Sequence, residues 1–462
     1  MKIVVLNGSP KGNQSVTLQF VRFLEKKYSQ HTFQIFQIAH DIRKIETEEA
    51  LFNKIIANVS EADGILWAFP LYYFLISAQY KRFIELIWER NKEGTFQDKY
   101  TAAISTSIHF FDHTAHNYIH AICDDLGMKF LGSYSADMYD LTKKTEQKNF
   151  LIFGDQFLKG IEKAVATARE YPSLQTNHFR YVPQGSSQPV AKQSNKDVLI
   201  LSDGTTSQTN LGLMIEKLKK CFSQGAKVVN LSDIAIKGGC LGCIRCGYDN
   251  TCIYEGKDEF TTFFNETVRK APIIVFAGSI KDRYLSSMWK LFFDRSFFNN
   301  HSPYLLGKQI GFLVSGPLGQ IPNLQQILEG YTELQQGNLV DIVTDEYEQS
   351  SEIDGLIEGL GYRLIEYSTI GYMKPSTFLG VGGRKIFRDD IYGRLRFPFQ
   401  ADHASYKKRG AYDFPQKDYK ARITSAFLML LTKIPAMRKE IYNKRIVEEM
   451  VKPLKKIVDK AA

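Results

Sequence analysis

This 462-residue sequence lacks an export signal and a long apolar run, and its six cysteines are not spread evenly along the chain. The start of the chain has a run of only four apolar residues, Ile3 to Leu6, before Asn7, which is too short for the core of a signal peptide. The longest uncharged stretch, 64–80, is interrupted by Pro70, and the apolar stretch 425–431 is too short to cross a bilayer. We therefore expect no transmembrane segment and a location in a reducing cytoplasm.

Neither a scarcity of core-forming residues nor a strong charge imbalance is present. Apolar residues make up 44% of the chain and charged residues 24%, which excludes a disordered or fibrous protein. The length predicts two or three domains. The net charge of +9 is uneven, because residues 371–462 contain 21 basic and 9 acidic side chains. The remaining chain is slightly acidic, so the basic excess belongs to the C-terminal part.

Short apolar runs alternate with amphipathic segments, and this pattern occurs twice. The first series of runs predicts strands at 3–6, 33–38, 64–69, 102–105 and 130–135. Strands alternating with helices predict a parallel sheet covered on both faces. The pattern stops at 171–196 and restarts at 198–201, and Ser286 and Lys290 repeat Ser77 and Lys81 at an offset of 209. We therefore predict an α/β chain with two tandem doubly wound sheets of five parallel strands. The expected parts are a domain at 1–170, a linker at 171–196, a second domain at 197–371 with an insertion at about 236–256, and a basic, aromatic, mostly helical extension at 372–462.

The first strand runs into a turn of glycine, serine and lysine and then into a helix, over GSPKGNQSVTLQF (8–20). Backbone N–H groups at the helix start, together with Ser9, Lys11, Ser15 and Thr17, would bind a phosphate. The segment lacks the P-loop and GxGxxG patterns, which disfavours a nucleoside-triphosphate enzyme. An ordinary strand–helix turn is the alternative interpretation.

An aromatic segment, AFPLYYFLIS (68–77), follows the third strand. In a doubly wound sheet, ligands bind beyond the carboxyl ends of the strands, where this segment should face Ser9. Its tyrosines and Phe74 would offer faces and edges to a planar ring.

These two motifs, in this order and separation, resemble the flavodoxin-like NAD(P)H-dependent FMN reductases over residues 1–170 and, more weakly, 196–370. The resemblance implies flavodoxin-like sheets, FMN as cofactor and NAD(P)H as co-substrate. It implies that the FMN phosphate is held by Ser9, Lys11, Asn13, Gln14, Ser15 and Thr17. It further implies that the flavin ring lies against Pro70, Leu71, Tyr72, Tyr73, Phe74, Thr106 and Ser107. The second copy has Leu201 and Asp203 in place of Gly8 and Pro10, so we expect its site to be empty or altered, although Thr205, Ser207 and Thr209 leave an alternative open.

Four of the six cysteines form the pattern C-x2-C-x2-C-x5-C, at Cys240, Cys243, Cys246 and Cys252. This spacing favours a [4Fe–4S] cluster, with zinc and redox or structural thiols as alternatives. Cys123 and Cys221 lie on apolar helical faces and are predicted core residues. The spacing, inside such a domain, resembles the iron–sulfur flavoproteins of anaerobes. In that family, electrons pass between a cluster and the flavin of a neighbouring subunit, so the chain resembles such a dimer fused end to end.

The predicted function is that of an FMN-dependent NAD(P)H oxidoreductase with a [4Fe–4S] cluster. Electrons would pass between NAD(P)H or a ferredoxin-like acidic carrier, FMN and a small-molecule acceptor. A non-enzymatic FMN/iron–sulfur carrier or redox sensor is the alternative, and a zinc-stabilised nucleic-acid-binding protein is a third class. His109 and His113 follow the fourth strand and are candidate catalytic residues.

The basic extension is expected to pack over the seam between the two domains, with docking of an acidic electron carrier as the next interpretation. Nucleic acid is not an expected partner, and a homodimer is left open. Contact of residues 427–431 with a membrane surface is a minor alternative.

Overall fold

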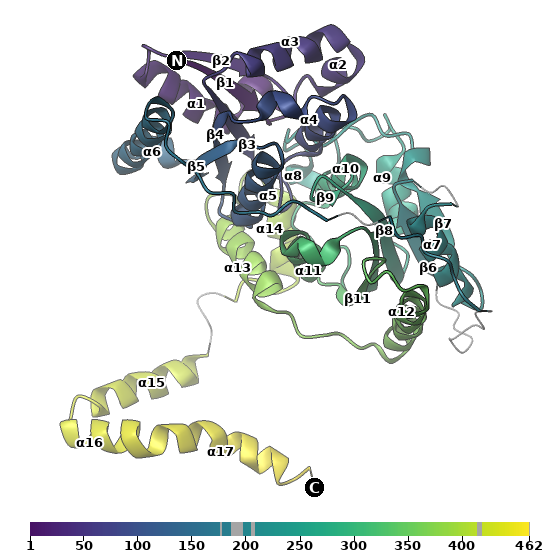
Figure 1. The fold of residues 1–462 in the computed structure, drawn as a ribbon. Helices are drawn as coiled ribbons and strands as arrows, with labels where there is room; N and C mark the ends of the chain where they lie inside the picture. The colour runs from purple at the N-terminus through teal and green to yellow at the C-terminus, as the bar shows by residue number, and fades with distance from the viewer. Residues whose placement is uncertain (176–177, 186–196, 205–207, 414–417, 462) are drawn as a thin grey trace. The chain divides into compact units, whose positions relative to one another are not determined.

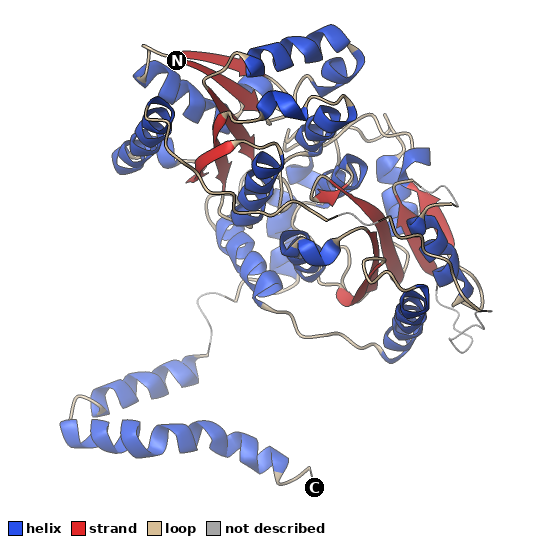
Figure 2. Cartoon of the chain, in the orientation of Figure 1, coloured by secondary structure: helices blue, strands red, loops and turns tan. Residues whose placement is uncertain are grey.

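The computed structural model describes residues 1–175, 178–185, 197–204, 208–413 and 418–461. The chain divides into two compact units, Met1–Tyr406 and Lys407–Ala462. Both sheets belong to the first unit, where strands and helices alternate along the chain (Figure 2). The linker expected at 171–196 falls partly on residues 176–177 and 186–196, which lie outside the described residues.

The first sheet has five parallel strands in the order β2-β1-β3-β4-β5. The strands are β1 (Lys2–Asn7), β2 (Thr32–Phe36), β3 (Gly64–Pro70), β4 (Tyr100–Ser107) and β5 (Lys129–Asp137). Helices α1 (Val16–Lys27) and α6 (Lys144–Glu162) share an apolar core with one face. On the other face, Trp67 and Phe69 of β3 pack on α4 (Ala78–Glu89) and α5 (Asp112–Asp125). Helices α2 (Ile42–Thr47) and α3 (Glu49–Ser60) lie between β2 and β3 in the chain.

The second sheet has the equivalent order β7-β6-β8-β10-β11, and these five strands are parallel. They are β6 (Val198–Ser202), β7 (Lys227–Asn230), β8 (Ile273–Lys281), β10 (Gln309–Ser315) and β11 (Asn338–Thr344). A sixth, short strand that the sequence did not predict, β9 (Tyr284–Leu285), pairs antiparallel with β8. Helices α7 (Asn210–Lys220) and α12 (Ser350–Ile370) pack on one face; α10 (Ser287–Ser296) packs on the other and contacts α11 (Pro322–Leu334). The predicted pair of doubly wound parallel sheets is confirmed.

Helices α4 and α10 lie side by side between the two sheets (Figure 1). Each helix places a buried carboxylate at the N-terminus of the other. Asp294 accepts a hydrogen bond from the Ala78 amide at 2.7 Å, and Glu85 accepts one from the Ser287 amide at 2.6 Å. This reciprocal exchange is the pattern of a two-fold interface, and the helix dipoles favour both carboxylates.

The first unit is completed by short helices α8 (Cys246–Asp249) and α9 (Phe260–Phe263) in the second half, by α13 (Phe378–Tyr392), and by most of α14 (Gln400–Lys408), in which the unit ends. The second unit contains α15 (Tyr419–Leu431), α16 (Pro435–Glu440) and α17 (Ile446–Val458). Within the described parts of the chain, no helix has both the length and the apolar content needed to cross a membrane.

Candidate functional site

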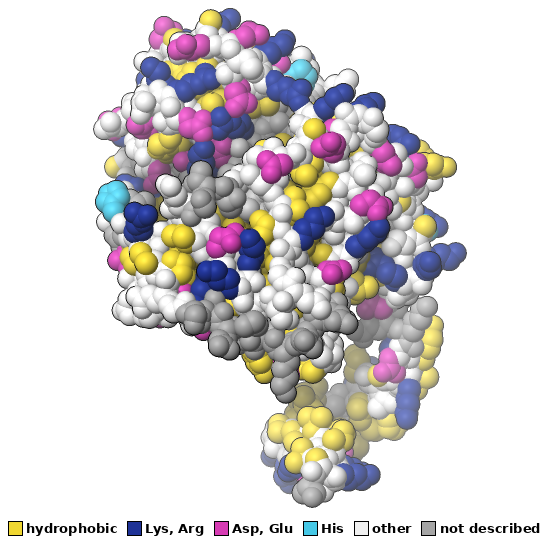
Figure 3. Space-filling view, turned by 90° about the vertical axis from the view of Figure 1, so that its right-hand side faces the viewer, with side chains coloured by type: hydrophobic (Ala, Val, Ile, Leu, Met, Phe, Trp, Pro, Cys, Tyr) yellow, Lys and Arg dark blue, Asp and Glu magenta, His cyan; other side chains and the backbone are white. Residues whose placement is uncertain are grey.

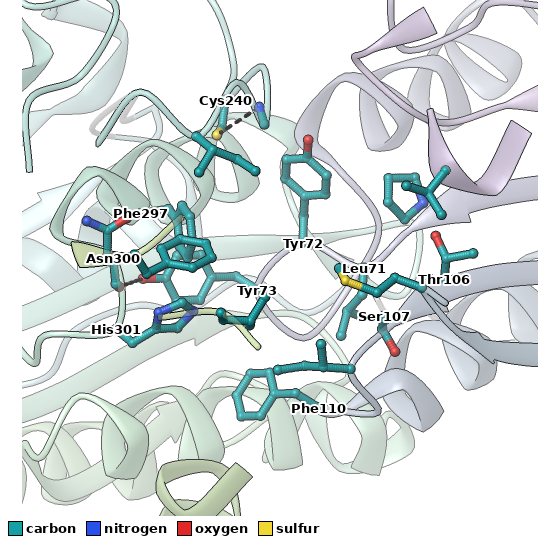
Figure 4. A pocket seen from close by; sticks show the side chains of 18 of the residues that line it. Leu71, Tyr72, Tyr73, Thr106, Ser107, Phe110, Cys240, Phe297, Asn300 and His301 are labelled. Carbon is teal, nitrogen blue, oxygen red and sulfur yellow. Dashed lines mark hydrogen bonds between the residues drawn. The ribbon is translucent and has the colours of Figure 1, made fainter. Parts of the chain in front are cut away.

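A pocket of about 430 Å³ lies at the carboxyl end of the first sheet, next to the ends of β1, β3 and β4 (Figure 4). This volume is in the range of small-molecule and cofactor sites. Three parts of the chain line it: the loops of the first sheet, the segments 240–244 and 294–301 of the second half, and residues of the extension such as Phe387 and Phe399. The pocket therefore needs both halves of the first unit.

The turn after β1 forms one end of the pocket through Ser9, Lys11 and Ser15. Ser15 is the N-cap of α1, and its Oγ accepts a hydrogen bond from the Leu18 amide at 3.3 Å. Thr17 lies behind this turn, where its Oγ1 and that of Thr106 are 2.6 Å apart. Hydroxyls, a lysine and the N-terminus of a 12-residue helix make this end of the pocket suitable for a phosphate.

Two residues predicted to bind the phosphate, Asn13 and Gln14, are exposed and do not line the pocket. The Asn13 side chain accepts a hydrogen bond from Gln37 Nε2 at 2.9 Å. Their predicted role stays a prediction.

The segment after β3 places Pro70, Leu71, Tyr72 and Tyr73 on the pocket wall. A tight turn, in which the Tyr72 amide donates to the Leu75 carbonyl at 2.7 Å, directs these rings into the site. Tyr73 has a φ of 33°, a strained conformation for a bulky residue of the kind that gathers at functional sites. Burial raises the pKa of both tyrosines well above its usual range, so their hydroxyls stay neutral.

Phe74 lies outside the pocket, although the sequence placed it beside the flavin ring. Its side chain is fully buried and packs edge-on against Phe110 and Phe111, with ring centroids 5.0 and 4.4 Å away. It therefore supports the aromatic segment from behind. Thr106 and Ser107, at the end of β4, do line the pocket.

The cysteine-bearing segment packs directly on these two loops. A Cβ placed on Gly242 would lie 2.2 Å from Tyr72 Oη and 3.0 Å from Lys11 Cε, so only glycine allows this approach. Gln79 of α4 donates a hydrogen bond to the Cys240 carbonyl at 3.0 Å. Cys240 lines the pocket next to Tyr72 (Figure 4). The cysteine segment of the second half thus meets the phosphate and aromatic loops of the first.

The four clustered cysteines differ in exposure. Cys246 is buried, Cys240 and Cys252 are half-buried, and Cys243 is exposed. The Gly242 amide donates to Cys240 Sγ at 3.4 Å. Among the residues that the structure describes, no three His, Cys, Asp or Glu side chains form a group that could hold a metal ion. Cys123 and Cys221 are fully buried, which confirms their predicted place in the core.

A buried arginine anchors the base of the cysteine segment. The guanidinium of Arg295 donates to both oxygens of Asp258 at 2.7 and 3.0 Å and to the Gly238 carbonyl at 2.9 Å. It also stacks over the Tyr254 ring, 4.4 Å from the centroid. These contacts fix both ends of the segment against α10.

A histidine–aspartate pair on the pocket wall was not predicted from the sequence. His301 lines the pocket, and its Nδ1 lies 2.6 Å from Oδ2 of the fully buried Asp402. The His301 amide also donates to Asp402 at 3.0 Å. The imidazole packs on Phe387, with centroids 3.9 Å apart. Within the described residues, no hydrogen bond engages Nε2, so this nitrogen is free to meet a ligand. The two residues are 101 positions apart, and no sequence motif connects them.

Asn300 is a second unpredicted residue of the pocket wall. It is fully buried, and its Nδ2 donates to the Cys246 carbonyl at 2.8 Å. Its Oδ1 is buried with no partner among the described groups, which leaves an acceptor that a bound molecule would satisfy. A φ of 52° sets it in a strained conformation.

The predicted catalytic histidines do not line the pocket. His109 is exposed, with Nδ1 2.9 Å from Asp112, and His113 is exposed and stacks on Phe111. His116 is buried, with Nε2 2.7 Å from Ser105 Oγ, and burial lowers its pKa to about 4. The catalytic role of His109 and His113 stays a prediction.

The second sheet has a pocket of about 290 Å³ at its own carboxyl edge, lined in part by Asp345 and Glu346. Asp345 accepts hydrogen bonds from Ser315 Oγ and the Gly316 amide, both at 2.7 Å. These carboxylates disfavour a phosphate. Thr209 caps α7, whereas Thr205 and Ser207 lie outside the described residues.

Comparison with known proteins gives one family match and several similar folds. Residues 1–139 match the family model described as NADPH-dependent FMN reductase. An NADH:FMN oxidoreductase in its apo form is 13% identical, with a TM-score of 0.30 over 37% of this chain and 91% of that one. The flavoenzyme NAD(P)H:(acceptor) oxidoreductase from Paracoccus denitrificans is 17% identical, with a TM-score of 0.28 over 34% of this chain and 97% of that one. No curated protein matches the chain.

The family match includes both loops of the first sheet that line the pocket. Residues 1–139 are therefore similar to the NADPH-dependent FMN reductase family.

Proposed function

We propose that the chain is an FMN-dependent NAD(P)H oxidoreductase that reduces a planar, largely apolar acceptor. The observation that carries this proposal is the composition of the pocket. Family-type phosphate and aromatic loops form one side, and Phe297, Phe387 and Phe399 from the rest of the unit form the other. Bound FMN would supply the hydride chemistry there.

The chain's own residues would divide the binding of FMN between two ends of the pocket. Ser9, Lys11, Ser15 and the start of α1 would bind the phosphate. Residues 70–73, with Thr106 and Ser107, would border the flavin ring. Thr17 would hold the phosphate turn against β4 from behind. Asn300 Oδ1 would accept a hydrogen bond from a ring N–H or an amide.

His301 would act as the proton donor to the acceptor. Reduction of a quinone-like acceptor by two electrons also takes up two protons, and His301 Nε2 is placed on the pocket wall to deliver one. Asp402 would hold the imidazole in one orientation through its hydrogen bond to Nδ1, which leaves Nε2 facing the acceptor. The ring of Phe387 fixes the imidazole plane.

The four cysteines would bind a [4Fe–4S] cluster beside the flavin. Four thiols at this spacing suit a thiolate-ligated cluster by number and chemistry, and the N–H···S contact to Cys240 is of the kind that tunes one. In the described structure their side chains do not gather into a group that could hold a metal ion, so they would have to move together to bind the cluster. Cys240 borders both the cysteine segment and the pocket, which supports electron exchange between the two sites. A ferredoxin-like acidic carrier would then be the protein partner, and a homodimer stays a prediction.

Purified protein tests the flavin assignment directly. We expect one FMN per chain and steady oxidation of NADPH or NADH with a soluble benzoquinone. Lys11→Ala should weaken FMN binding about tenfold or more, because one phosphate cation is lost. Lys159→Ala, at an exposed lysine of α6, is the matched control and should bind FMN as the wild type does. Failure of the wild-type chain to bind added FMN would overturn the proposal.

Anaerobic iron and sulfide analysis tests the cluster separately. Cys243→Ser should lose iron and the associated absorbance but keep FMN. Zinc without sulfide in the wild-type protein, or full iron content in the variant, would contradict the assignment while leaving the flavin proposal standing.

A further inference from the structure

The helical unit of residues 407–462, called here the tail unit, exposes an unusual amount of apolar surface. Helices α15, α16 and α17 have no buried residues. In α15, Phe427, Met429 and Leu430 are 59%, 70% and 61% exposed, and in α17, Met450 and Leu454 are 70% and 60% exposed. Exposed apolar clusters of this kind mark an interaction surface.

The apolar side chains of α17 all lie on one face. At 100° per residue, its seven apolar residues fall within an arc of about 140°. They are Ile446, Val447, Met450, Val451, Leu454, Ile457 and Val458. The charged residues Glu448, Glu449, Lys452, Lys455 and Lys456 occupy the opposite face. The circumference of the helix is thus divided into an apolar face and a charged face, and the charged face contains three lysines.

The net charge of the chain is located in the same unit. Residues 407–462 contain 15 Lys and Arg and 6 Asp and Glu, a net charge of +9. The whole chain contains 59 basic and 50 acidic residues. Residues 1–406 therefore contain 44 basic and 44 acidic residues and carry no net charge. In the space-filling view, Lys and Arg side chains lie beside the hydrophobic ones on the tail unit (Figure 3).

We propose that the tail unit binds the surface of a membrane that contains anionic lipids. An amphipathic helix with a basic polar face lies in the plane of the lipid headgroups, its apolar side chains in the acyl boundary. Lysine stems cover apolar surface while their ammonium groups reach the anionic headgroups. The oxidoreductase unit would thereby be held at a membrane without a spanning helix.

Charge argues against the other occupants. A second tail unit would bring +9 against +9, and residues 1–406 carry no net charge to attract it. Nucleic acid would pair with the lysines but would leave the aliphatic face of α17 in water, since bases stack on aromatic rings. An anionic lipid surface satisfies both faces of the helix at once.

Sedimentation of the full chain with phosphatidylcholine vesicles that contain or lack phosphatidylglycerol tests the proposal. We expect at least about tenfold stronger binding to the anionic vesicles, weakening as salt is raised. Leu454→Asn/Ile457→Asn, which leaves the charge unchanged, should lower binding about tenfold, because two apolar side chains no longer enter the bilayer. Circular dichroism checks that the variant keeps its helices.

A charge-matched pair of variants separates the tail unit from the rest of the chain. Lys452→Gln/Lys455→Gln/Lys456→Gln should lower anionic-vesicle binding about tenfold. Lys144→Gln/Lys148→Gln/Lys163→Gln removes the same charge from exposed lysines of the first unit and should leave binding unchanged.

Equal binding to both vesicle types, or no binding to either, would overturn the proposal. So would binding to an acidic ferredoxin without vesicle binding, or a homodimer that the Leu454→Asn/Ile457→Asn variant dissociates. None of these readouts depends on FMN or on activity.

Discussion

His301 and Asp402 lie far apart in sequence but form one hydrogen-bonded pair on the pocket wall. His301→Gln should lower kcat for quinone reduction about a hundredfold, because a positioned proton donor contributes on that order. Asp402→Asn should lower kcat less, since the imidazole remains but loses the carboxylate that orients it. FMN affinity should stay within about twofold in both variants.

Steady-state kinetics across pH check this role against a merely structural one. In His301→Gln, the part of the kcat profile that depends on this imidazole should disappear. His31→Gln, at a histidine near the N-terminus with Nδ1 3.2 Å from the Met1 amine, is the matched control and should keep the wild-type profile. Wild-type kcat in His301→Gln would assign the proton to another donor.

His116 predicts a pH dependence of stability. Its imidazole is buried with Nδ1 lacking a partner among the described groups, and burial lowers its pKa to about 4 from a usual value near 6.5. The unfolded chain therefore takes up a proton at a pH where the folded chain does not. The free energy of unfolding from this residue is fully present above about pH 6.5 and is lost as pH falls towards 4, by about 3 kcal/mol.

Urea unfolding at pH 7 and pH 4.5 measures this effect. His116→Gln keeps a polar group near Ser105 but has no imidazole to titrate. Between pH 7 and pH 4.5, its free energy of unfolding should therefore fall by about 2–3 kcal/mol less than that of the wild type. The same loss in both proteins would show that His116 is not the titrating group.

Helices α4 and α10 each contain a buried ion pair at the seam between the sheets. Lys290 and Asp294 of α10 are fully buried, and Asp294 also accepts the hydrogen bond from the Ala78 amide of α4. Burial raises the pKa of Asp294, against the opposing effect of Lys290. Lys290→Met should cost about 3–5 kcal/mol, because it leaves a buried carboxylate unpaired.

The double variant Lys290→Met/Asp294→Asn should recover most of this loss, since the asparagine oxygen still accepts from Ala78. Urea unfolding measures both variants. Lys270→Met, which removes an exposed partner of Glu266, is the control and should cost less than about 1 kcal/mol. A double variant no more stable than Lys290→Met would place the cost in packing instead of charge.

At the scale of elements, the sequence predicted what depends on neighbours in the chain. The turn at Ser9 and the segment 70–73 are local motifs at strand ends, and a doubly wound sheet brings strand ends together. The repeat of Ser77 and Lys81 as Ser286 and Lys290 indicated where α4 and its counterpart α10 lie in the chain. The orientation of Phe74 could not be read from the sequence, because its own positive φ turns the ring into the core and periodicity does not report φ. Its predicted place beside the flavin ring stays a prediction.

Contacts between distant segments escaped prediction. Nothing local marks Asn300 and His301 as pocket residues or Asp402 as the partner of His301, because these residues meet only after the two sheets pack and the extension folds over them. The approach of Gly242 to Tyr72 is of the same kind. A glycine between two cysteines is the one signal that could have indicated a close contact at that position.

At the scale of the whole molecule, the boundary between the two compact units, after Tyr406, splits the C-terminal extension into two parts with different roles. Residues 373–406 supply Phe387, Phe399 and Asp402 to the pocket region, whereas residues 407–462 form the tail unit. A chain that ends at Tyr406 should therefore keep FMN affinity and kcat within about twofold of the full chain and lose its binding to anionic vesicles.

The variant Phe387→Ala/Phe399→Ala, in the full chain, should have the opposite effect. It opens the apolar wall of the pocket, so kcat/KM for the quinone should fall about tenfold or more, while vesicle binding should be kept. Flavin titration, quinone kinetics and vesicle sedimentation on the two proteins would give this crossed pattern. Loss of activity in the chain that ends at Tyr406 would show instead that the tail unit is needed for the chemistry, since the pocket residues themselves are all retained.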